Sequence, residues 1–186
     1  MDIRRNNNII KRNLLNFWVK RGSSVLDIGC GQGGDIHKWK NLCVRLVGVD
    51  PNSWAIEEAK RRSQGYGTFI VGDIRDAPNN ELFDVICYNF SLQYQPLELL
   101  PEVTRRLKPG GLLLGVISDS TQLDNASDGI QVTQIDESNI KVFIPDTPYY
   151  ANGPVIEPIV HKEVLIREAD KLNLKLQIWE PFSMYA

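Results

Sequence analysis

Acidic residues stand beside glycines and short apolar segments in the first half of this chain. Asp27 and Asp35 bracket a turn that contains Gly29, Gly31 and Gly34. Glycine permits a tight turn and lets a ligand lie directly against the backbone. Two carboxylates would repel a pyrophosphate but attract a ligand that carries an ammonium and a sulfonium. The turn therefore favours a cationic nucleoside, although its spacing formally fits the G-x-G-x-x-G dinucleotide pattern.

Two further acids come at the ends of the next apolar segments. Asp50 closes the run Val47-Gly48-Val49-Asp50 and can accept both hydroxyls of a ribose. Asp73 follows the apolar residues 68–71 and is suited to accept a hydrogen bond from an adenine amino group. Each acid alone could simply cap a helix or a turn. In this order, however, the acids predict one crevice at the carboxyl edge of a sheet.

The elements that must position these acids alternate along the chain. Short apolar segments are followed by helical patterns, which predicts a doubly wound α/β fold with a mostly parallel sheet in a single domain of residues 1–186. A polar, turn-rich stretch spans residues 119–139, and the four tryptophans (Trp18, Trp39, Trp54 and Trp179) are expected in the core. The expected strands are 24–28, 46–49, 68–71, 84–88, 112–117, 130–135, 140–144 and 175–179. The expected helices are a first one through Ile10 and Leu14 up to Gly22, a second through His37 and Trp39, and 53–62, 97–107 and 162–172.

Composition restricts the class of protein. The chain has 186 residues, a formal net charge of −2 and 42% hydrophobic residues, which is ordinary for a globular protein. A nucleic-acid partner would need a local patch or a base-sized pocket. The cysteines Cys30, Cys43 and Cys87 lack metal-ligand spacing, so we expect no metal and an intracellular location. We also expect a soluble protein, because no apolar run is long enough to span a membrane.

The ordered motifs of residues 24–117 resemble those of the Rossmann-like S-adenosylmethionine methyltransferases. The turn Lys108-Pro109-Gly110-Gly111 before an apolar strand is also typical of that superfamily. The resemblance implies S-adenosyl-L-methionine as the cofactor. It implies that the cofactor is bound by Asp27, Gly29, Gly31, Asp35, Asp50 and Asp73.

Two amino-terminal segments resemble the guanine-N7 methyltransferases of the mRNA cap in eukaryotes and their large DNA viruses. Residues 7–11 are similar to the N-N-x-hydrophobic-K helix of that family, which implies that Lys11 reaches the methionine end of the cofactor. Residues 33–39 are similar to its G-G-D-x-x-K-W run, which implies that Asp35 lies near the same moiety.

Two later segments resemble the cap-binding part of the same family. Residues 89–94 correspond to its Q-F-x-x-H-Y segment between cofactor and guanine, with Asn89 in place of glutamine and Gln93 in place of histidine. The resemblance implies that Asn89 and Phe90 contact the cofactor and that Phe90, Gln93 and Tyr94 contact the guanine. Glu157 lies in a segment where the family has a glutamate that accepts hydrogen bonds from guanine N1 and N2. A carboxylate suits that edge because it only accepts.

Members of that family usually continue into two more strands, one of which carries an aromatic residue at the cap pocket. Those strands are not expected here, and Tyr149, Tyr150 and Tyr185 are alternatives for covering part of the pocket. The implied partner is the GpppN end of capped RNA, with a guanylyltransferase or triphosphatase domain or subunit as a second candidate. The implied location is the nucleus for a cellular protein and the cytoplasm or virion for a viral one.

The expected reaction is methyl transfer to guanine N7, an atom with a lone pair and no proton. No general base is required, and catalysis would come from proximity and electrostatics, so no residue is expected to act as a chemical catalyst. Two alternatives remain: a methyltransferase for small molecules and a cofactor-binding subunit without activity. A nicotinamide-dependent enzyme is a more distant fourth.

Overall fold

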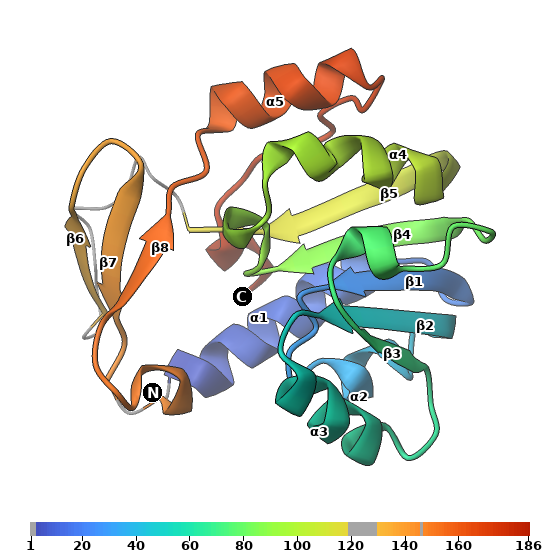
Figure 1. The fold of residues 1–186 in the computed structure, drawn as a ribbon, viewed down its shortest axis with the longest axis horizontal. Coiled ribbons are helices and arrows are strands. Elements are labelled where there is room, and N and C mark those ends of the chain that lie inside the picture. Colours follow the sequence, from blue (N-terminus) through green and yellow to red (C-terminus); the bar gives the residue numbers. More distant parts are fainter. Residues whose placement is uncertain (1–2, 119–129, 146) are drawn as a thin grey trace.

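A parallel sheet forms the centre of the molecule in the computed structural model, which describes residues 3–118, 130–145 and 147–186. Five strands pair side by side in the order β3-β2-β1-β4-β5 (Figure 1). This order reverses direction between β1 and β4, which is where doubly wound sheets bind ligands. The strands are β1 (Ser23–Ile28), β2 (Cys43–Asp50), β3 (Thr68–Val71), β4 (Phe83–Asn89) and β5 (Leu107–Val116).

Helices cover both faces of this sheet, as the alternation of strand and helix signals predicted. Successive side chains of β1 enter different cores: Val25 packs in the cluster beneath α1, α2 and α3, and Leu26 in the cluster beneath α4. The doubly wound α/β fold is thereby confirmed (Figure 1). The helices are α1 (Ile3–Trp18), α2 (Ile36–Trp39), α3 (Ser53–Ser63), α4 (Leu100–Arg106) and α5 (Lys162–Lys171).

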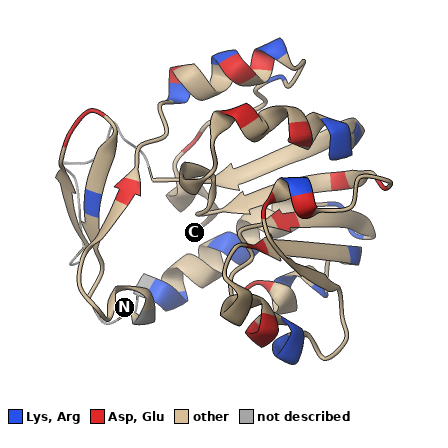
Figure 2. Ribbon diagram, viewed as in Figure 1, with Lys and Arg blue, Asp and Glu red and all other residues tan. Residues whose placement is uncertain are grey.

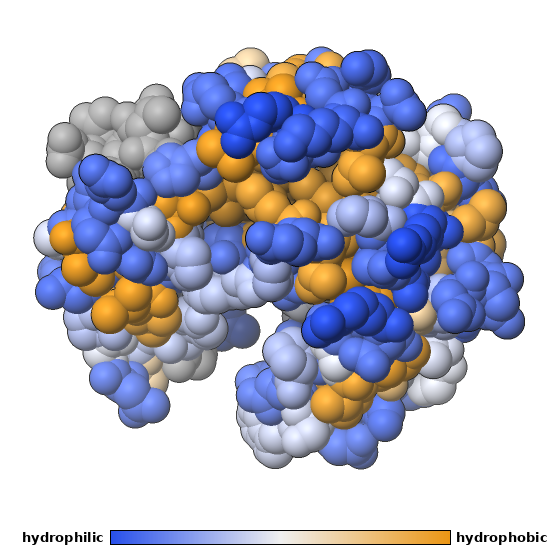
Figure 3. All heavy atoms as spheres, turned by 45° about the horizontal axis from the view of Figure 1, so that its top comes forward, coloured by the Kyte–Doolittle hydropathy of each residue, from blue (hydrophilic) through white to orange (hydrophobic). Residues whose placement is uncertain are grey.

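A second, antiparallel sheet lies opposite the carboxyl ends of the central strands (Figure 1). It consists of β6 (Gln131–Gln134), β7 (Asn139–Phe143) and β8 (Val155–Pro158), of which β8 was not expected. Its core is small and is formed by Ile140, Val142 and Tyr150. A hollow separates this sheet from the main body in the space-filling view (Figure 3). The expectation of a single domain stays a prediction.

Short 3-10 segments connect the elements at the sites of interest. They are η1 (Ile74–Asp76), η2 (Leu92–Tyr94), η3 (Leu97–Leu99), η5 (Pro148–Tyr150) and η6 (Phe182–Tyr185). None of the described helices is long and apolar enough to cross a membrane.

The expected helix 97–107 is shorter than predicted and is divided. It starts as η3, continues as α4 and ends at Arg106, because Leu107 already pairs with Phe83 of β4. The turn at Pro109-Gly110-Gly111 is a bulge inside β5, since the register jumps to Val85 opposite Leu112.

Two further expectations were wrong. Residues 175–179 form no strand: their alternating pattern is present, but no described strand pairs with them, and Leu176 and Ile178 stay exposed. Trp39 is buried as expected, whereas Trp54 at the start of α3 is exposed. Residues 119–129 of the polar stretch lie outside the described residues.

Candidate functional site

The glycine turn after β1 is pressed against the ends of two neighbouring strands. Gly29 has φ +73° and donates its N–H to the carbonyl oxygen of Val49 at 2.8 Å. A Cβ built on Gly29 would lie 2.4 Å from Cβ of Ser91, so only glycine fits. The Ser91 hydroxyl donates in turn to the carbonyl oxygen of Ile28. The predicted turn is therefore locked by β2 and by the segment after β4.

Asp50 at the end of β2 is fixed by two backbone amides. Its Oδ2 accepts from the N–H of Gly31 and its Oδ1 from the N–H of Asn52, each at 2.9 Å. A carboxylate oxygen accepts about two hydrogen bonds, so both oxygens retain capacity for the hydroxyls of a ribose. A Cβ built on Gly31 meets no atom within 4 Å, which leaves the backbone beside Asp50 open to a ligand.

Asp35 lies at the centre of an ion-pair network that joins the glycine turn to α1. Its carboxylate accepts from Lys11 Nζ at 2.9 Å and from Lys38 Nζ at 2.6 Å, and Asn89 Nδ2 lies 3.4 Å away. Burial would raise the pKa of Asp35, but the charges of Lys11 and Lys38 outweigh it and lower the pKa. Basic residues line α1 while acidic ones cluster near the ends of the central strands (Figure 2).

Asp27 is buried between the turn and α2, where Trp39 Nε1 donates to it at 3.0 Å. Burial, followed by the charge of Asp35, raises the pKa of Asp27 to about 7. The charge of Asp50 contributes in the same direction. These three acids therefore share one electrostatic environment, in which a nearby cation would be stabilised.

Asp73 lies beside the same crevice, because Gly72 before it donates to the backbone oxygen of Asp50 at 3.0 Å. Its carboxylate caps η1 and binds Arg75 at 2.6 Å, and these hydrogen bonds lower the pKa of Asp73. An adenine amino group would have to share this carboxylate with Arg75. The role given to Asp73 stays a prediction.

The end of β4 and the segment that follows it carry two buried acceptor atoms that have no partner in the described part of the chain. They are Oδ1 of Asn89 and Oε1 of Gln93, and buried polar atoms are normally hydrogen-bonded. Between them Phe90 adopts φ +59°, rare for a large side chain, with Lys11 Nζ 5.7 Å from its ring centre. Orphan acceptors and backbone strain are typical of a ligand site.

The small sheet contributes Glu157, which faces η2. Glu157 is 5% exposed and accepts from the Tyr150 hydroxyl at 3.2 Å. Gln93 is also buried and donates Nε2 to the carbonyl oxygen of Phe90, so its Oε1 points away from that bond. Burial, followed by the hydrogen bond to Tyr149 and the charge of Glu157, raises the pKa of Tyr94. Tyr94 and Glu157 thus lie within hydrogen-bond reach of each other, and Gln93 precedes Tyr94 in η2. Their role toward a guanine stays a prediction.

Of the three tyrosines left open by the sequence, two reach this place. Tyr150 holds Glu157, and the hydroxyl of Tyr149 lies 3.2 Å from that of Tyr94. Tyr185 instead bonds Trp18 Nε1 on α1. We refer to Phe90, Gln93, Tyr94, Tyr150 and Glu157 as the acceptor slot.

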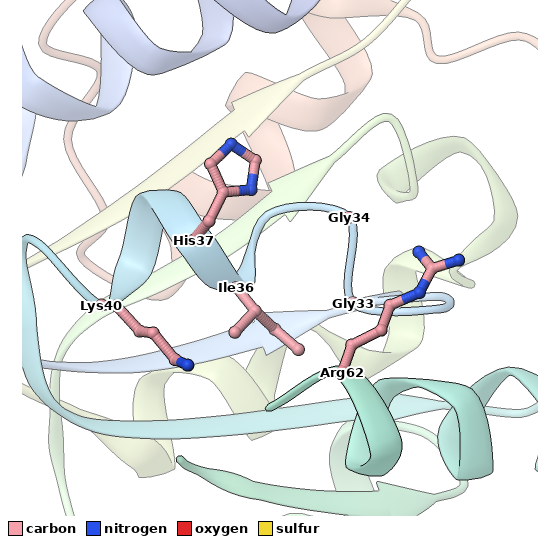
Figure 4. Close-up of a pocket in the computed structure, with 6 residues that line it drawn as sticks. All are labelled: Gly33, Gly34, Ile36, His37, Lys40 and Arg62. Atoms are coloured by element: carbon pink, nitrogen blue, oxygen red, sulfur yellow. The ribbon is translucent and has the colours of Figure 1, made fainter. Parts of the chain in front are cut away.

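A cavity of about 220 Å³ lies elsewhere, between α2 and α3 on the outer side of the glycine turn (Figure 4). It is lined by His37, Lys40 and Arg62 among others, but by none of the four aspartates. His161 lies at the start of α5 and contacts the backbone oxygen of Glu137. Neither histidine belongs to the crevice, and no metal-like cluster of His, Cys, Asp and Glu occurs among the described residues.

Three residues of the site make contacts that the sequence did not indicate. Lys38 is almost fully buried against Asp35, and the G-G-D-x-x-K-W run contained it without revealing this contact. Ser91 closes the glycine turn, and Tyr150 holds Glu157. The contact of Ser91 joins segments distant in sequence, so no local pattern could have indicated it. Lys38 lies only three residues after Asp35, a spacing at which opposite charges on a helix commonly pair.

Comparison with known proteins agrees with this geometry. Residues 25–111 match a family described as "Methyltransferase domain". The PH0226 protein of Pyrococcus horikoshii has a similar fold, with a TM-score of 0.67 and 22% identity over 92% of this chain and 82% of that one. A S-adenosylmethionine-dependent methyltransferase of Clostridium acetobutylicum gives a TM-score of 0.62 and 19% identity over 92% and 80%. Fold and domain match define the class of proteins that this chain resembles: the Rossmann-like, S-adenosylmethionine-dependent methyltransferases.

Within this class, curated relatives confirm the resemblance to the cap guanine-N7 methyltransferases. The enzyme of Schizosaccharomyces pombe is 28% identical over 98% of this chain, and that of Candida glabrata 25% over 98%. The first enzyme of Oryza sativa is 30% identical over 61% of this chain. The chain spans 62%, 55% and 38% of the lengths of these relatives, respectively.

Proposed function

We propose that this chain transfers a methyl group from S-adenosylmethionine to N7 of the guanine at the 5′ cap of RNA. The observation that carries the proposal is the buried carboxylate of Glu157, which lies beside Tyr94 of η2. Asn89, five residues before Tyr94, contacts Asp35. A buried acceptor-only group suits guanine, which presents two donors on one edge. The cap methyltransferase relatives support the same substrate.

The residues of the crevice fit the cofactor. Asp50 would hold the ribose, and Asn89 offers an acceptor without a partner. Lys11 and Asp35 form an ion pair that can bind the carboxylate and ammonium of the methionine moiety. When bound, the cofactor supplies an electrophilic methyl group on a sulfonium. The negative charges of Asp35 and Asp50, together with that of Asp27 when it is ionised, would favour that cation.

The acceptor slot would orient the guanine without removing a proton from it. Glu157 would accept from N1 and N2, Gln93 Oε1 offers a further acceptor, and Phe90 provides an aromatic face between the two ligands. Because N7 already has a free lone pair, alignment and electrostatics are the protein's contribution. A partner domain or subunit with guanylyltransferase or triphosphatase activity would supply the unmethylated cap, in the compartment where transcripts are capped.

A radiolabelled methyl-transfer assay on GpppRNA, followed by nuclease digestion, tests this function. We expect label at N7 of the cap guanine and none on RNA that already carries that methyl group. Faster turnover on small nucleophiles would indicate the small-molecule methyltransferase instead. Binding of S-adenosylhomocysteine without transfer to any acceptor would indicate a cofactor-binding subunit and reject the proposal.

Substitution of Asp50, compared with a control substitution, distinguishes a loss of cofactor binding from a general loss of folding. Asp50→Ala removes the acceptor proposed for the ribose, so we expect S-adenosylhomocysteine to bind at least about 10-fold more weakly by calorimetry. Asp84→Ala is the matched control, because Asp84 lies at the opposite end of β4 and binds Ser24 and Lys108. Equal losses in the two variants would contradict the role of Asp50.

A further inference from the structure

Tyr149 is an exposed aromatic residue whose position is nevertheless fixed. Tyr149 is 62% exposed, so its ring buries little apolar surface in the core. Its hydroxyl lies 3.2 Å from that of Tyr94, and its ring packs edge-on against Tyr150 at 5.0 Å between ring centres. Two contacts from different segments therefore hold the ring in one orientation while leaving a face open to solvent.

Exposure increases stepwise from the acceptor slot to this ring. Glu157 is 5% exposed and Tyr150, which bonds it, 9%, whereas Tyr94 is 42% exposed. Tyr149 contacts Tyr150 and Tyr94, and the described residues show no hydrogen bond between Tyr149 and Glu157. A flat group that lies on Tyr149 is therefore a different group from the one that bonds Glu157 inside the slot.

We infer that Tyr149 forms a second base-binding position, which stacks the first transcribed nucleobase of the capped RNA while the guanine occupies the slot. Aromatic side chains take nucleobases by stacking without regard to base identity, because each base has a π face. That tolerance suits a transcript end whose first base varies. The second position would make the site selective for a guanosine that is joined through phosphates to another nucleoside.

Calorimetry with GpppA and with GTP, both in the presence of S-adenosylhomocysteine, tests this position. Both ligands carry guanine and a triphosphate, but only GpppA carries a second base. We expect GpppA to bind the wild-type chain about 10-fold more tightly than GTP. Tyr149→Leu should abolish this preference and leave the Kd of GTP unchanged, whereas Tyr149→Phe should keep it, because the ring remains.

The control variant is Phe17→Leu, since Phe17 is an exposed aromatic residue on α1 that packs against Trp18 and Tyr185. It should retain the preference for GpppA. Equal weakening of both ligands by Tyr149→Leu would mean that the ring only supports Tyr94, and an unchanged preference would mean that no base stacks there; either result overturns the inference. The inference rests on the proposed function. A wild-type chain that binds S-adenosylhomocysteine but neither GpppA nor GTP would overturn the inference and the proposed function together. That result differs from the two results for Tyr149→Leu, which overturn the inference alone.

Discussion

A single buried carboxyl group, that of Asp27, shows how closely charge and burial are coupled in the crevice. Its side chain points from β1 toward the α1–α3 face, where Trp39 donates to it. Burial and the charge of Asp35 raise its pKa from the ordinary value of 3.8 to about 7. Lys11 acts in the opposite direction but does not compensate. Near neutral pH, the protonation of Asp27 therefore responds to small changes around it.

This shift predicts a pH dependence of stability with a definite sign. Between pH 3.8 and about 7 the folded chain keeps a proton on Asp27 that the unfolded chain has lost. The stabilisation from the protonated carboxyl is thus complete below about pH 4. It decreases as the pH rises and is lost once the pH has passed about 7, on the order of 4 kcal/mol in total. Asp27→Asn stays neutral and can still accept from Trp39. Urea unfolding should show the variant gaining free energy of unfolding relative to wild type from pH 5 to pH 8.

In the difference between the free energies of unfolding of variant and wild type, the contributions of all other titrating groups cancel. A difference that stays constant from pH 5 to pH 8 would contradict the raised pKa of Asp27.

At the scale of elements, the fit of the glycine turn against the segment after β4 is a specific packing requirement. Gly29 and Gly110 have nearly equal φ angles of +73° and +72°, but only Gly29 has a neighbour, Ser91, where a Cβ would stand. Alanine at either position costs about 1–2 kcal/mol for the left-handed backbone. Comparing alanine at the two positions therefore distinguishes the cost of backbone strain, which both share, from the cost of steric overlap, which arises only at Gly29.

We expect Gly29→Ala to lower the free energy of unfolding by about 2 kcal/mol more than Gly110→Ala does, measured by denaturant titration. Ser91→Gly in the Gly29→Ala background should recover much of this extra loss, because it removes the Cβ that alanine meets. Equal losses at the two glycines, or no recovery in the double variant, would show that the turn has room to move.

The same scale shows which elements a sequence can predict. The central strands were predicted because each carries its own apolar run, and the acids were predicted because they end those runs. The strand β8 was missed because Glu157 and Pro158 interrupt any such pattern, and it forms only through pairing with β7. Residues 175–179 had the pattern of a strand but no partner. Local composition indicates whether a segment tends to form a strand, but the hydrogen bonds of a sheet also require a neighbouring strand with which to pair.

At the scale of the whole molecule, the proposed ligand site takes its residues from two units of unequal size. The central sheet has extensive clusters on both faces, whereas the cluster of the small sheet has three buried hydrophobic residues, Ile140, Val142 and Tyr150. The order of the aspartates along the chain predicted that they lie close together, and Asp27, Asp35 and Asp50 interact electrostatically in the structure. The tyrosines of the slot could not be chosen from sequence, because three were candidates and only packing places them.

The difference in core size between the two sheets predicts a difference in their local stability. Amide hydrogens of β6, β7 and β8 should exchange faster than those of β1 and β4, because fewer buried contacts oppose local opening. Addition of S-adenosylhomocysteine with GpppA should slow exchange in η2 and β8 but leave β6 nearly unchanged. Hydrogen-exchange mass spectrometry measures both effects, and equal protection of the two sheets in the free chain would contradict the first.

Separate cores also affect how the molecule can change over many generations. Asp27 and Asp50, which we propose for the cofactor, stand on the central sheet, whereas Tyr149, Tyr150 and Glu157 belong to the segment with its own cluster. If the proposed function holds, mutations in residues 131–158 can therefore alter which molecule is methylated at little risk to the scaffold beneath. A library of variants confined to that segment is the natural starting point for redirecting the methyl group to a new acceptor.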